Sequence, residues 1–107
     1  MSLDVYLTAV RPTEVYSDNI THNLNVMAGE AGIYEALWRP EEIGITLAHQ
    51  LIPILEEGLA KLRANPEHYE KFNPENGWGN YVGLVKFVVD YLAACKENPD
   101  ARVSVWR

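Results

Sequence analysis

Residues 18–23 (DNITHN) place a carboxylate, two carboxamides, a hydroxyl and an imidazole close together in the chain. We expect them to join a strand to a helix, whose N-terminal end offers free N–H groups and the positive end of the helix dipole. That dipole disfavours imidazolium, so a neutral His22 could act as a base, a ligand or a hydrogen-bonding group. The alternative is that Asp18, Asn19 and Thr21 only cap the helix, which explains those three residues but not His22. Asn19, His22 and Asn23 are therefore candidate ligand-binding residues, and His22 and Asp18 are candidate catalytic residues.

A second candidate site is the loop at residues 73–81 (NPENGWGNY). Its asparagines, including Asn80, carry amide donors and acceptors, and its glycines allow a ligand to approach the backbone closely. Trp78 and Tyr81 add flat apolar faces that can stack on a ring. The alternative is a tight connector in which Trp78 fills the core. The segment is not a phosphate-binding loop, because no lysine follows in the Walker pattern.

Arg39 lies in a third segment, residues 38–42 (WRPEE), and could clamp a carboxylate or a phosphate. Such a segment is also typical of a helix end followed by a proline start and solvent-facing acids. The histidines His22, His49 and His68 are far apart in the sequence and fit no zinc-binding spacing. We therefore expect no metal site and no cofactor.

The positioning elements follow from periodicity. Residues 3–10 alternate between apolar and polar, which predicts a half-buried strand, and residues 14–17 return as the second strand of a hairpin. Helical spacing then starts at Ile20 and runs to Ala31, where Gly32 ends it. A short helix is expected at residues 33–38, and Pro40 opens one further turn.

The second half of the chain predicts two longer helices and a last strand. An apolar stripe over residues 46–64 predicts a helix capped by Thr46, which Pro53 should kink or split. Asn80 should cap a helix that begins at Tyr81 and is apolar on nearly all sides, so we place that helix centrally in the core. Residues 67–72 make one short turn and residues 101–107 alternate again. The chain is thus predicted to be one α+β domain, residues 1–107, with a small antiparallel sheet (the N-terminal hairpin plus the C-terminal strand) covered on one face by about four helices.

Composition excludes several classes of protein. The net charge is −6, and no lysine or arginine cluster exists to follow a nucleic-acid backbone, so no nucleic acid is expected as a partner. No apolar run reaches membrane-spanning length, so no membrane partner is expected either. Cys95 is the only cysteine, which forbids an intramolecular disulfide and favours a small buried side chain over a nucleophile. The first ten residues lack the pattern of a signal peptide, and the cytoplasm is the expected location.

The outer face of the predicted sheet carries Tyr6, Val10 and Trp106 among polar residues. If all three face solvent, this patch favours a protein partner or a homodimer. If loops cover the terminal strands, the same residues form only a secondary core.

Four segments of the chain also carry a resemblance as a set: DNITHNL at 18–24, AGIY at 31–34, LWRPEEIG at 37–44 and NGWG at 76–79. With them, the chain resembles almost end to end a group of small proteins encoded in bacterial and phage or prophage genomes. That group has no established activity, so the resemblance assigns no role to any residue. It implies only the context of an accessory gene, which often encodes a compact binder or an inhibitor.

Three functional hypotheses follow. The first is a non-catalytic binding module whose polar and aromatic pocket holds a small anionic or ring-bearing ligand, through the candidate residues Asn19, His22, Asn23, Arg39, Trp78 and Asn80. The second is an interaction or inhibitor protein that acts through the sheet face that carries Tyr6 and Trp106, or through its acidic surface. The third is a small hydrolase or transferase with His22 as the base and Asp18 as the group that orients it. The first hypothesis requires that the segments around His22 and Trp78 meet at a solvent-reachable hollow.

Overall fold

A computed structural model describes residues 1–9 and 13–107. Three strands, β1 (Ser2–Thr8), β2 (Glu14–Thr21) and β3 (Arg102–Trp106), form an antiparallel sheet in the order β2-β1-β3. The central strand β1 buries every second side chain, Leu3, Val5 and Leu7, completely. The alternation in the sequence therefore reports which face of the sheet meets the core.

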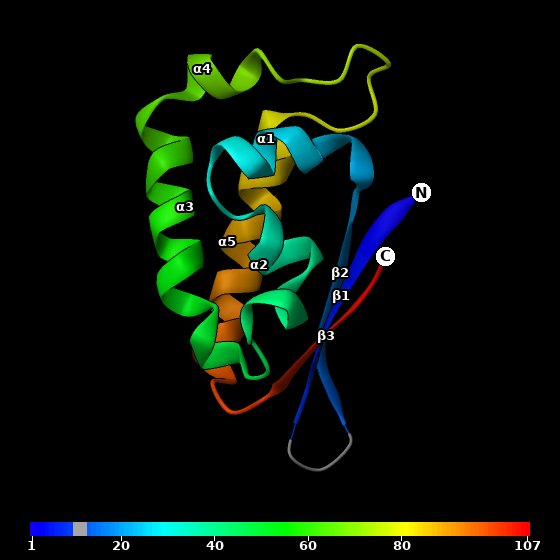
Figure 1. The fold of residues 1–107 in the computed structure, drawn as a ribbon, viewed down its shortest axis with the longest axis vertical. Coiled ribbons are helices and arrows are strands. Elements are labelled where there is room, and N and C mark those ends of the chain that lie inside the picture. Colours follow the sequence, from blue (N-terminus) through cyan, green and yellow to red (C-terminus); the bar gives the residue numbers. More distant parts are fainter. Residues whose placement is uncertain (10–12) are drawn as a thin grey trace.

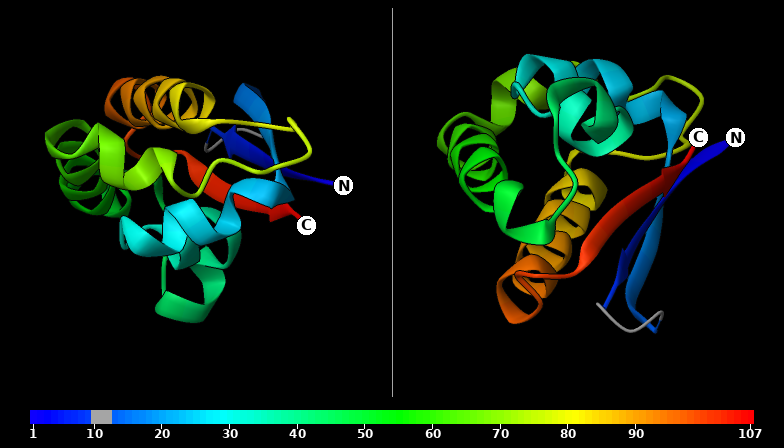
Figure 2. Two further views of the ribbon diagram at one scale, coloured as in Figure 1. Left: turned by 90° about the horizontal axis from the view of Figure 1, so that it is seen from above. Right: turned by 60° about the horizontal axis from the view of Figure 1, so that its bottom comes forward.

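The helices lie on one side of this sheet (Figures 1 and 2). They are α1 (Asn25–Glu30), α2 (Tyr34–Trp38), α3 (Ile52–Ala64), α4 (Pro66–Glu70) and α5 (Tyr81–Glu97), with the 3-10 helices η1 (His22–Leu24), η2 (Pro40–Ile43) and η3 (Ala48–Gln50) between them. The predicted α+β fold, with helices on one face of a three-stranded antiparallel sheet, is confirmed.

Strand β2 is longer than the sequence suggested. The expected helix start at Ile20 is wrong, because Asp18, Asn19, Ile20 and Thr21 all pair with β1. Ile20 is opposite Leu3 and is 8% exposed, so it belongs to the buried face of the sheet. Sheet pairing and this burial outweigh the local preference of Asp, Asn and Thr for helix caps.

Pro53 divides the helix that was expected from residue 46 onward. The segment forms η3 and then α3, with Pro53 in the first turn of α3, where its missing N–H costs no helical hydrogen bond. The Gln50 side-chain oxygen accepts hydrogen bonds from the backbone N–H of Thr46 and of Leu47, at 2.8 and 2.9 Å. The side chain of Gln50, and not that of Thr46 as expected, therefore caps the start of this helical segment.

Helix α5 packs one side against the core. Its predicted central position is wrong, because Val82 is 71% exposed and Val85 and Val89 are only half-buried on its other side. Its Asn80 side chain accepts a 2.7 Å hydrogen bond from the Gly83 N–H, which confirms the predicted cap. Leu84, Val88 and Tyr91 are completely buried along the same helix. The helix packs against both α3 and β2.

Within residues 1–9 and 13–107, no helix lies over the outer face of the sheet (Figure 2). Trp106 is 73% exposed there, whereas Tyr6 is half-buried. Val10, which was assigned to the same patch, lies outside the described residues, as do Arg11 and Pro12. Among the described helices, none is long and apolar enough to cross a bilayer.

Candidate functional site

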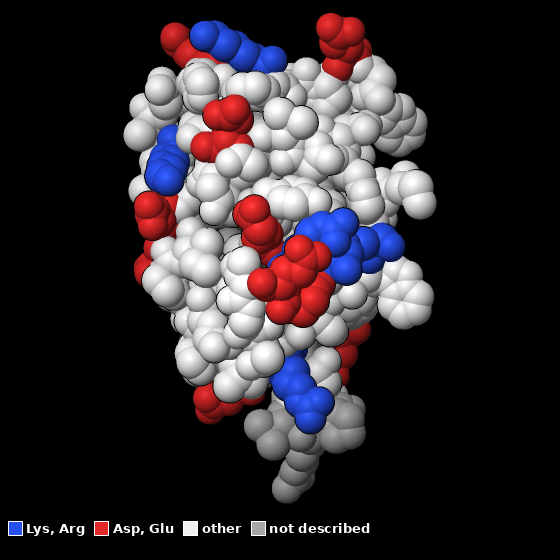
Figure 3. All heavy atoms as spheres, viewed as in Figure 1, with Lys and Arg blue, Asp and Glu red and all other residues white. Residues whose placement is uncertain are grey.

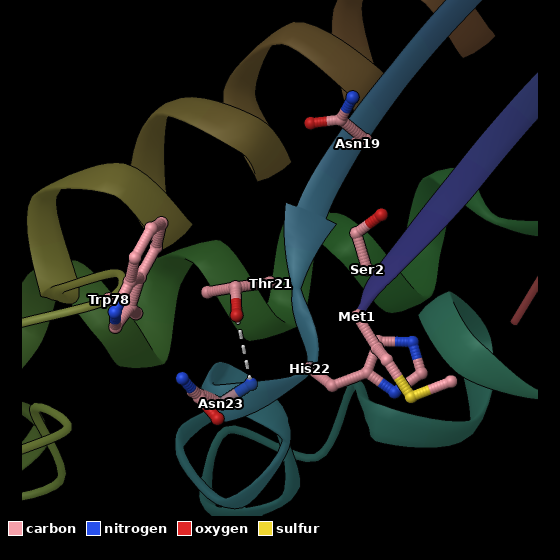
Figure 4. A pocket seen from close by; sticks show the side chains of 7 residues that line it. All are labelled: Met1, Ser2, Asn19, Thr21, His22, Asn23 and Trp78. Carbon is pink, nitrogen blue, oxygen red and sulfur yellow. Dashed lines mark hydrogen bonds between the residues drawn. The ribbon is translucent and has the colours of Figure 1, made fainter. Parts of the chain in front are cut away.

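The candidate segments around His22 and Trp78 meet at one hollow of about 750 Å³ (Figure 4). Three parts of the chain line it: the start of β1, the end of β2 with η1, and the loop before α5. Its lining residues are Met1, Ser2, Asn19, Thr21, His22, Asn23 and Trp78. The juxtaposition on which the binding hypothesis depends is therefore present.

Strand register builds one wall of this hollow. Ser2 is opposite Thr21 in the β1–β2 pair, and the backbone N–H of His22 donates to the Met1 carbonyl oxygen at 3.3 Å. Asn19 precedes Thr21 by two positions, so both side chains lie on the outer face of the sheet. In Figure 4 this end of β2 runs between Trp78 on one side and Met1 on the other.

The loop before α5 is held in place by its own polar groups. The Asn76 side-chain oxygen accepts from the Trp78 N–H at 2.9 Å, and the Asn73 side-chain oxygen accepts from the Tyr81 N–H at 2.8 Å. Gly79 has a φ of +89°, and a Cβ there would come 2.6 Å from Thr21 Cγ2. The loop therefore rests directly on the end of β2. Trp78 is 70% exposed, which excludes its interpretation as a plug of the core.

Apart from the His22 imidazole and the amino group of Met1, the polar groups of the hollow are uncharged amides and hydroxyls. The Asn23 backbone N–H donates to Thr21 Oγ1 at 3.3 Å. Within the part of the chain that the structure describes, the side-chain amides of Asn19 and Asn23 bond to no protein group. Each amide keeps its acceptor and both donors for a molecule in the hollow. None of the lining residues has a carboxylate, ammonium or guanidinium side chain.

His22 is half-buried, and its ring meets that of Trp38 edge to face, with centroids 6.2 Å apart. His22 Nε2 and Trp38 Nε1 are both buried without a hydrogen-bond partner among the described residues. Asp18 does not orient this imidazole. Its carboxylate accepts instead from the Tyr16 hydroxyl at 3.2 Å and from the Asn19 N–H at 2.8 Å. The structure therefore does not form the His22–Asp18 pair that the catalytic hypothesis needs.

Arg39 does not line the hollow. Its guanidinium donates to the Tyr34 hydroxyl at 3.2 Å and to a Glu42 carboxylate oxygen at 2.8 Å, and these two partners raise its pKa above the ordinary value. Asn80 is occupied with the cap of α5 and lines a neighbouring hollow. The hollow thus brings together Asn19, His22, Asn23 and Trp78, and leaves out Arg39 and Asn80.

Sequence reasoning missed Met1, Ser2 and Thr21 as lining residues. The available signal was the hairpin register, since extending the second strand to Thr21 sets Ser2 opposite it. Elsewhere, the described residues contain no group of three His, Cys, Asp or Glu side chains that could hold a metal ion. Burial raises the pKa of the completely buried Cys95 to about 12, which keeps its thiol protonated and unreactive.

Comparisons with protein-family models, with curated proteins and with solved structures found no match to this chain. The resemblance that its motifs suggest therefore stays a prediction.

Proposed function

We propose that this protein is a binding module that holds a small, neutral, ring-bearing molecule in the hollow beside Trp78. The observation that carries the proposal is that two free amides, Asn19 and Asn23, and an exposed indole, Trp78, line the same open hollow. They come from β2, η1 and the loop before α5.

The dimensions and composition of the hollow suit a small molecule. Its volume of about 750 Å³ lies in the range of ligand pockets, which combine apolar walls with a few polar groups that fix orientation. An exposed indole face stacks on flat or ring-shaped groups. A carboxamide can donate to one group and accept from its neighbour, so each amide suits a ring that carries adjacent donors and acceptors.

The charged side chains and the net charge favour a neutral ligand over an anionic one. The lining residues include no lysine or arginine, and Arg39, the cation proposed from the sequence, is bound to Glu42. The protein carries a net charge of −6, which repels anions at a distance. On the face in Figure 3, lysines and arginines lie scattered beside acidic residues and form no continuous basic patch.

Binding is better supported than hydrolysis or group transfer. A base of the predicted kind needs a partner that fixes its tautomer, and the Asp18 carboxylate is bonded to Tyr16 instead. His22 presents its Nε2 to the interior beside Trp38 and not to solvent. These contacts give His22 a packing role at the base of the hollow.

The test is a thermal-shift and tryptophan-fluorescence screen of nucleosides, neutral monosaccharides and uncharged aromatic metabolites. A ligand at one hundred times its Kd stabilises the folded state by about 2.7 kcal/mol, which is a readily measured shift in Tm. Trp78→Ala and Asn19→Ala should each abolish the shift. Trp106→Ala is the matched control, because it removes an equally exposed indole outside the hollow. If no neutral ring compound shifts the Tm, or if Trp106→Ala removes the shift as fully as Trp78→Ala, the proposal fails.

A second candidate function is protein interaction through the outer face of the sheet. It is favoured by the 73% exposure of Trp106, which is opposite Asp4 on β1, on a face that no helix covers. Sedimentation of the protein alone and of its Trp106→Arg variant tests this function. A homodimer through Tyr6 and Trp106 should become a monomer in the variant, and a monomer in both samples would count against the dimer.

A further inference from the structure

Strand β2 is an edge of the sheet, and one of its sides has no backbone partner. In the strand order β2-β1-β3, β2 pairs only with β1. No other backbone hydrogen bond reaches residues 14–21 from the described parts of the chain. An unpaired edge presents a row of N–H and C=O groups that can template another extended chain.

The register identifies the groups on the free side. The Val103 N–H points away from β1 and donates to the Thr46 carbonyl oxygen. Successive residues of a strand point their backbone groups to opposite sides, so the next residue, Ser104, faces β1 and exchanges hydrogen bonds with Tyr6. Hydrogen bonding alternates along β1, so Val5 and its alternate neighbours bond to β2. On β2 the outward groups then belong to alternate residues, Ser17, Asn19 and Thr21. The alternation does not extend to Val15, because the register shifts between Leu7 and Thr8 and leaves Val15 without a partner on β1.

A groove lies along this free edge. It has a volume of about 310 Å³ and runs between the end of β2 and the first turns of α5. Ile20 and Phe87 give it an apolar floor, and Gly83 keeps one wall free of side-chain atoms. A strand added to β2 would direct alternate side chains into this groove, as in β-augmentation.

The charges near the edge are mainly acidic. Glu14 begins β2 and is exposed, and Asp18 lies four positions on. Burial raises the pKa of Tyr16 well above its usual value, and the charges of Asp18 and Asp90 add to that shift, so both carboxylates lie near this strand. Lys86 supplies the opposing charge and is held by Asp90 at 2.6 Å.

We propose that the free edge of β2 binds an extended, basic peptide segment of a partner protein by antiparallel or parallel strand addition. The backbone groups at Ser17 and Asn19 pair with the peptide backbone. Its inward side chains enter the groove, where an apolar one packs beside Phe87 and a basic one faces Asp18, because Asp18 lies on the same face of the sheet as the groove. A second copy of this chain is a poorer occupant, because it would bring another net charge of −6 to an acidic edge.

This site is separate from the proposed ligand hollow in its chemistry. The hollow depends on the side chains of Trp78 and Asn23, whereas strand addition depends on the main chain of β2. The two share only Asn19 and Thr21 as lining residues. Either proposal can therefore fail without the other.

The probe is a capped seven-residue peptide whose alternate, groove-facing positions carry valine and lysine in turn and whose intervening positions carry threonine. It is titrated into the protein and followed by amide NMR shifts. We expect saturable shifts at Ser17 and Asn19. Two N-methylated versions supply the control: methylation at alternate positions that face β2 abolishes binding, and methylation at the intervening positions leaves it intact. This alternation is specific to strand pairing.

Three further measurements test whether charge at Asp18 contributes to peptide binding and whether Trp78 does not. Replacing lysine by glutamate in the peptide should weaken binding at least about fivefold. Asp18→Asn should weaken binding of the lysine peptide about threefold, while Asp4→Asn, in the central strand, changes it little. Trp78→Ala, which removes the ligand site, should leave the peptide affinity unchanged.

Several results would overturn the proposal: no shifts at millimolar peptide, shifts that map away from β2, or equal binding of the two methylated peptides. Concentration-dependent self-association that Ser17→Pro abolishes would identify a second copy as the occupant, and would also overturn it.

Discussion

Gly79 lies against Thr21 so closely that a Cβ on the glycine would be 2.6 Å from Thr21 Cγ2. This contact joins the loop before α5 to the end of β2, and so determines where Trp78 stands relative to Asn19. Gly79→Ala should therefore displace the loop as well as strain a residue whose φ is +89°. We expect a loss of about 2–4 kcal/mol in the free energy of unfolding, measured by urea denaturation, with a changed Trp78 fluorescence maximum.

Gly77→Ala is the matched control for that substitution. Gly77 has a similar φ of +76°, but a Cβ there meets no atom within 4 Å. Gly77→Ala should lower the free energy of unfolding by only about 1–2 kcal/mol, which is the cost of placing an alanine in the left-handed backbone conformation. Equal losses in the two variants would mean that the approach of Gly79 to Thr21 contributes nothing.

Gly58 in α3 faces Ile33, and a Cβ on Gly58 would overlap Ile33 Cγ2. Gly58→Ala should destabilise the protein by about 1–3 kcal/mol, although alanine favours a helix. In an Ile33→Ala background the overlap is gone, and the same substitution should become neutral or stabilising by about 0.5–1 kcal/mol. A double-mutant cycle from urea denaturation measures this coupling, and additive effects would contradict it.

Asn80→Ala removes the side-chain acceptor at the start of α5. Because its oxygen accepts from the Gly83 N–H at 2.7 Å, we expect a loss of about 1 kcal/mol in stability. Asn23→Ala is the comparison, since that exposed amide bonds to no described protein group, and its change should stay within about 0.5 kcal/mol. Thermal unfolding of both variants checks the difference, and an Asn23→Ala loss as large as that of Asn80→Ala would argue against it.

Because the Cys95 thiol is buried, we expect the protein to lose stability at alkaline pH. Burial raises the pKa of its thiol to about 12, while an unfolded cysteine ionises near about 8.5. Above that pH the unfolded state releases the thiol proton and the folded state keeps it, so the free energy of unfolding falls as pH rises. Between pH 7 and 10 we expect the fall to be about 1–2 kcal/mol larger than in Cys95→Ala.

Alkylation measures the same burial directly. Iodoacetamide at pH 8 should label the native protein far more slowly than the urea-unfolded protein, because only the exposed thiolate reacts. Rapid labelling of the native state, or parallel pH profiles of the two proteins, would show that the folded state does not protect the thiol.

Much of the fold is local in origin and could be predicted from the sequence. The alternation of apolar and polar residues predicts β1 and β3. The run of apolar residues after the capping residue Asn80 predicts α5. The end of β2 could not be predicted in this way. Residues 18–21 prefer helix caps locally, and only pairing with β1 and the burial of Ile20 make them a strand. Local preference is weak wherever a long-range partner decides the structure.

The candidate site likewise contains residues that could be predicted from the sequence and residues that could not. Asn19, His22, Asn23 and Trp78 were found from residue type, because unusual amides and aromatics stand out in any segment. Arg39 was assigned by type as well, but its neighbours Tyr34 and Glu42 occupy its guanidinium. Ser2 has no distinctive chemistry and joins the hollow only through its register opposite Thr21.

The pairing of Val5 with Val105 connects strands that lie a hundred positions apart in the chain. Closing a loop of that length costs conformational entropy before any contact in it is gained, and folds with many distant pairings form slowly. Because β3 is made long after β1 and β2, the edge of β1 that pairs with β3 stays unpaired for most of the synthesis of the domain. We therefore expect the hairpin of a nascent chain to be prone to pairing with other strands until β3 is made.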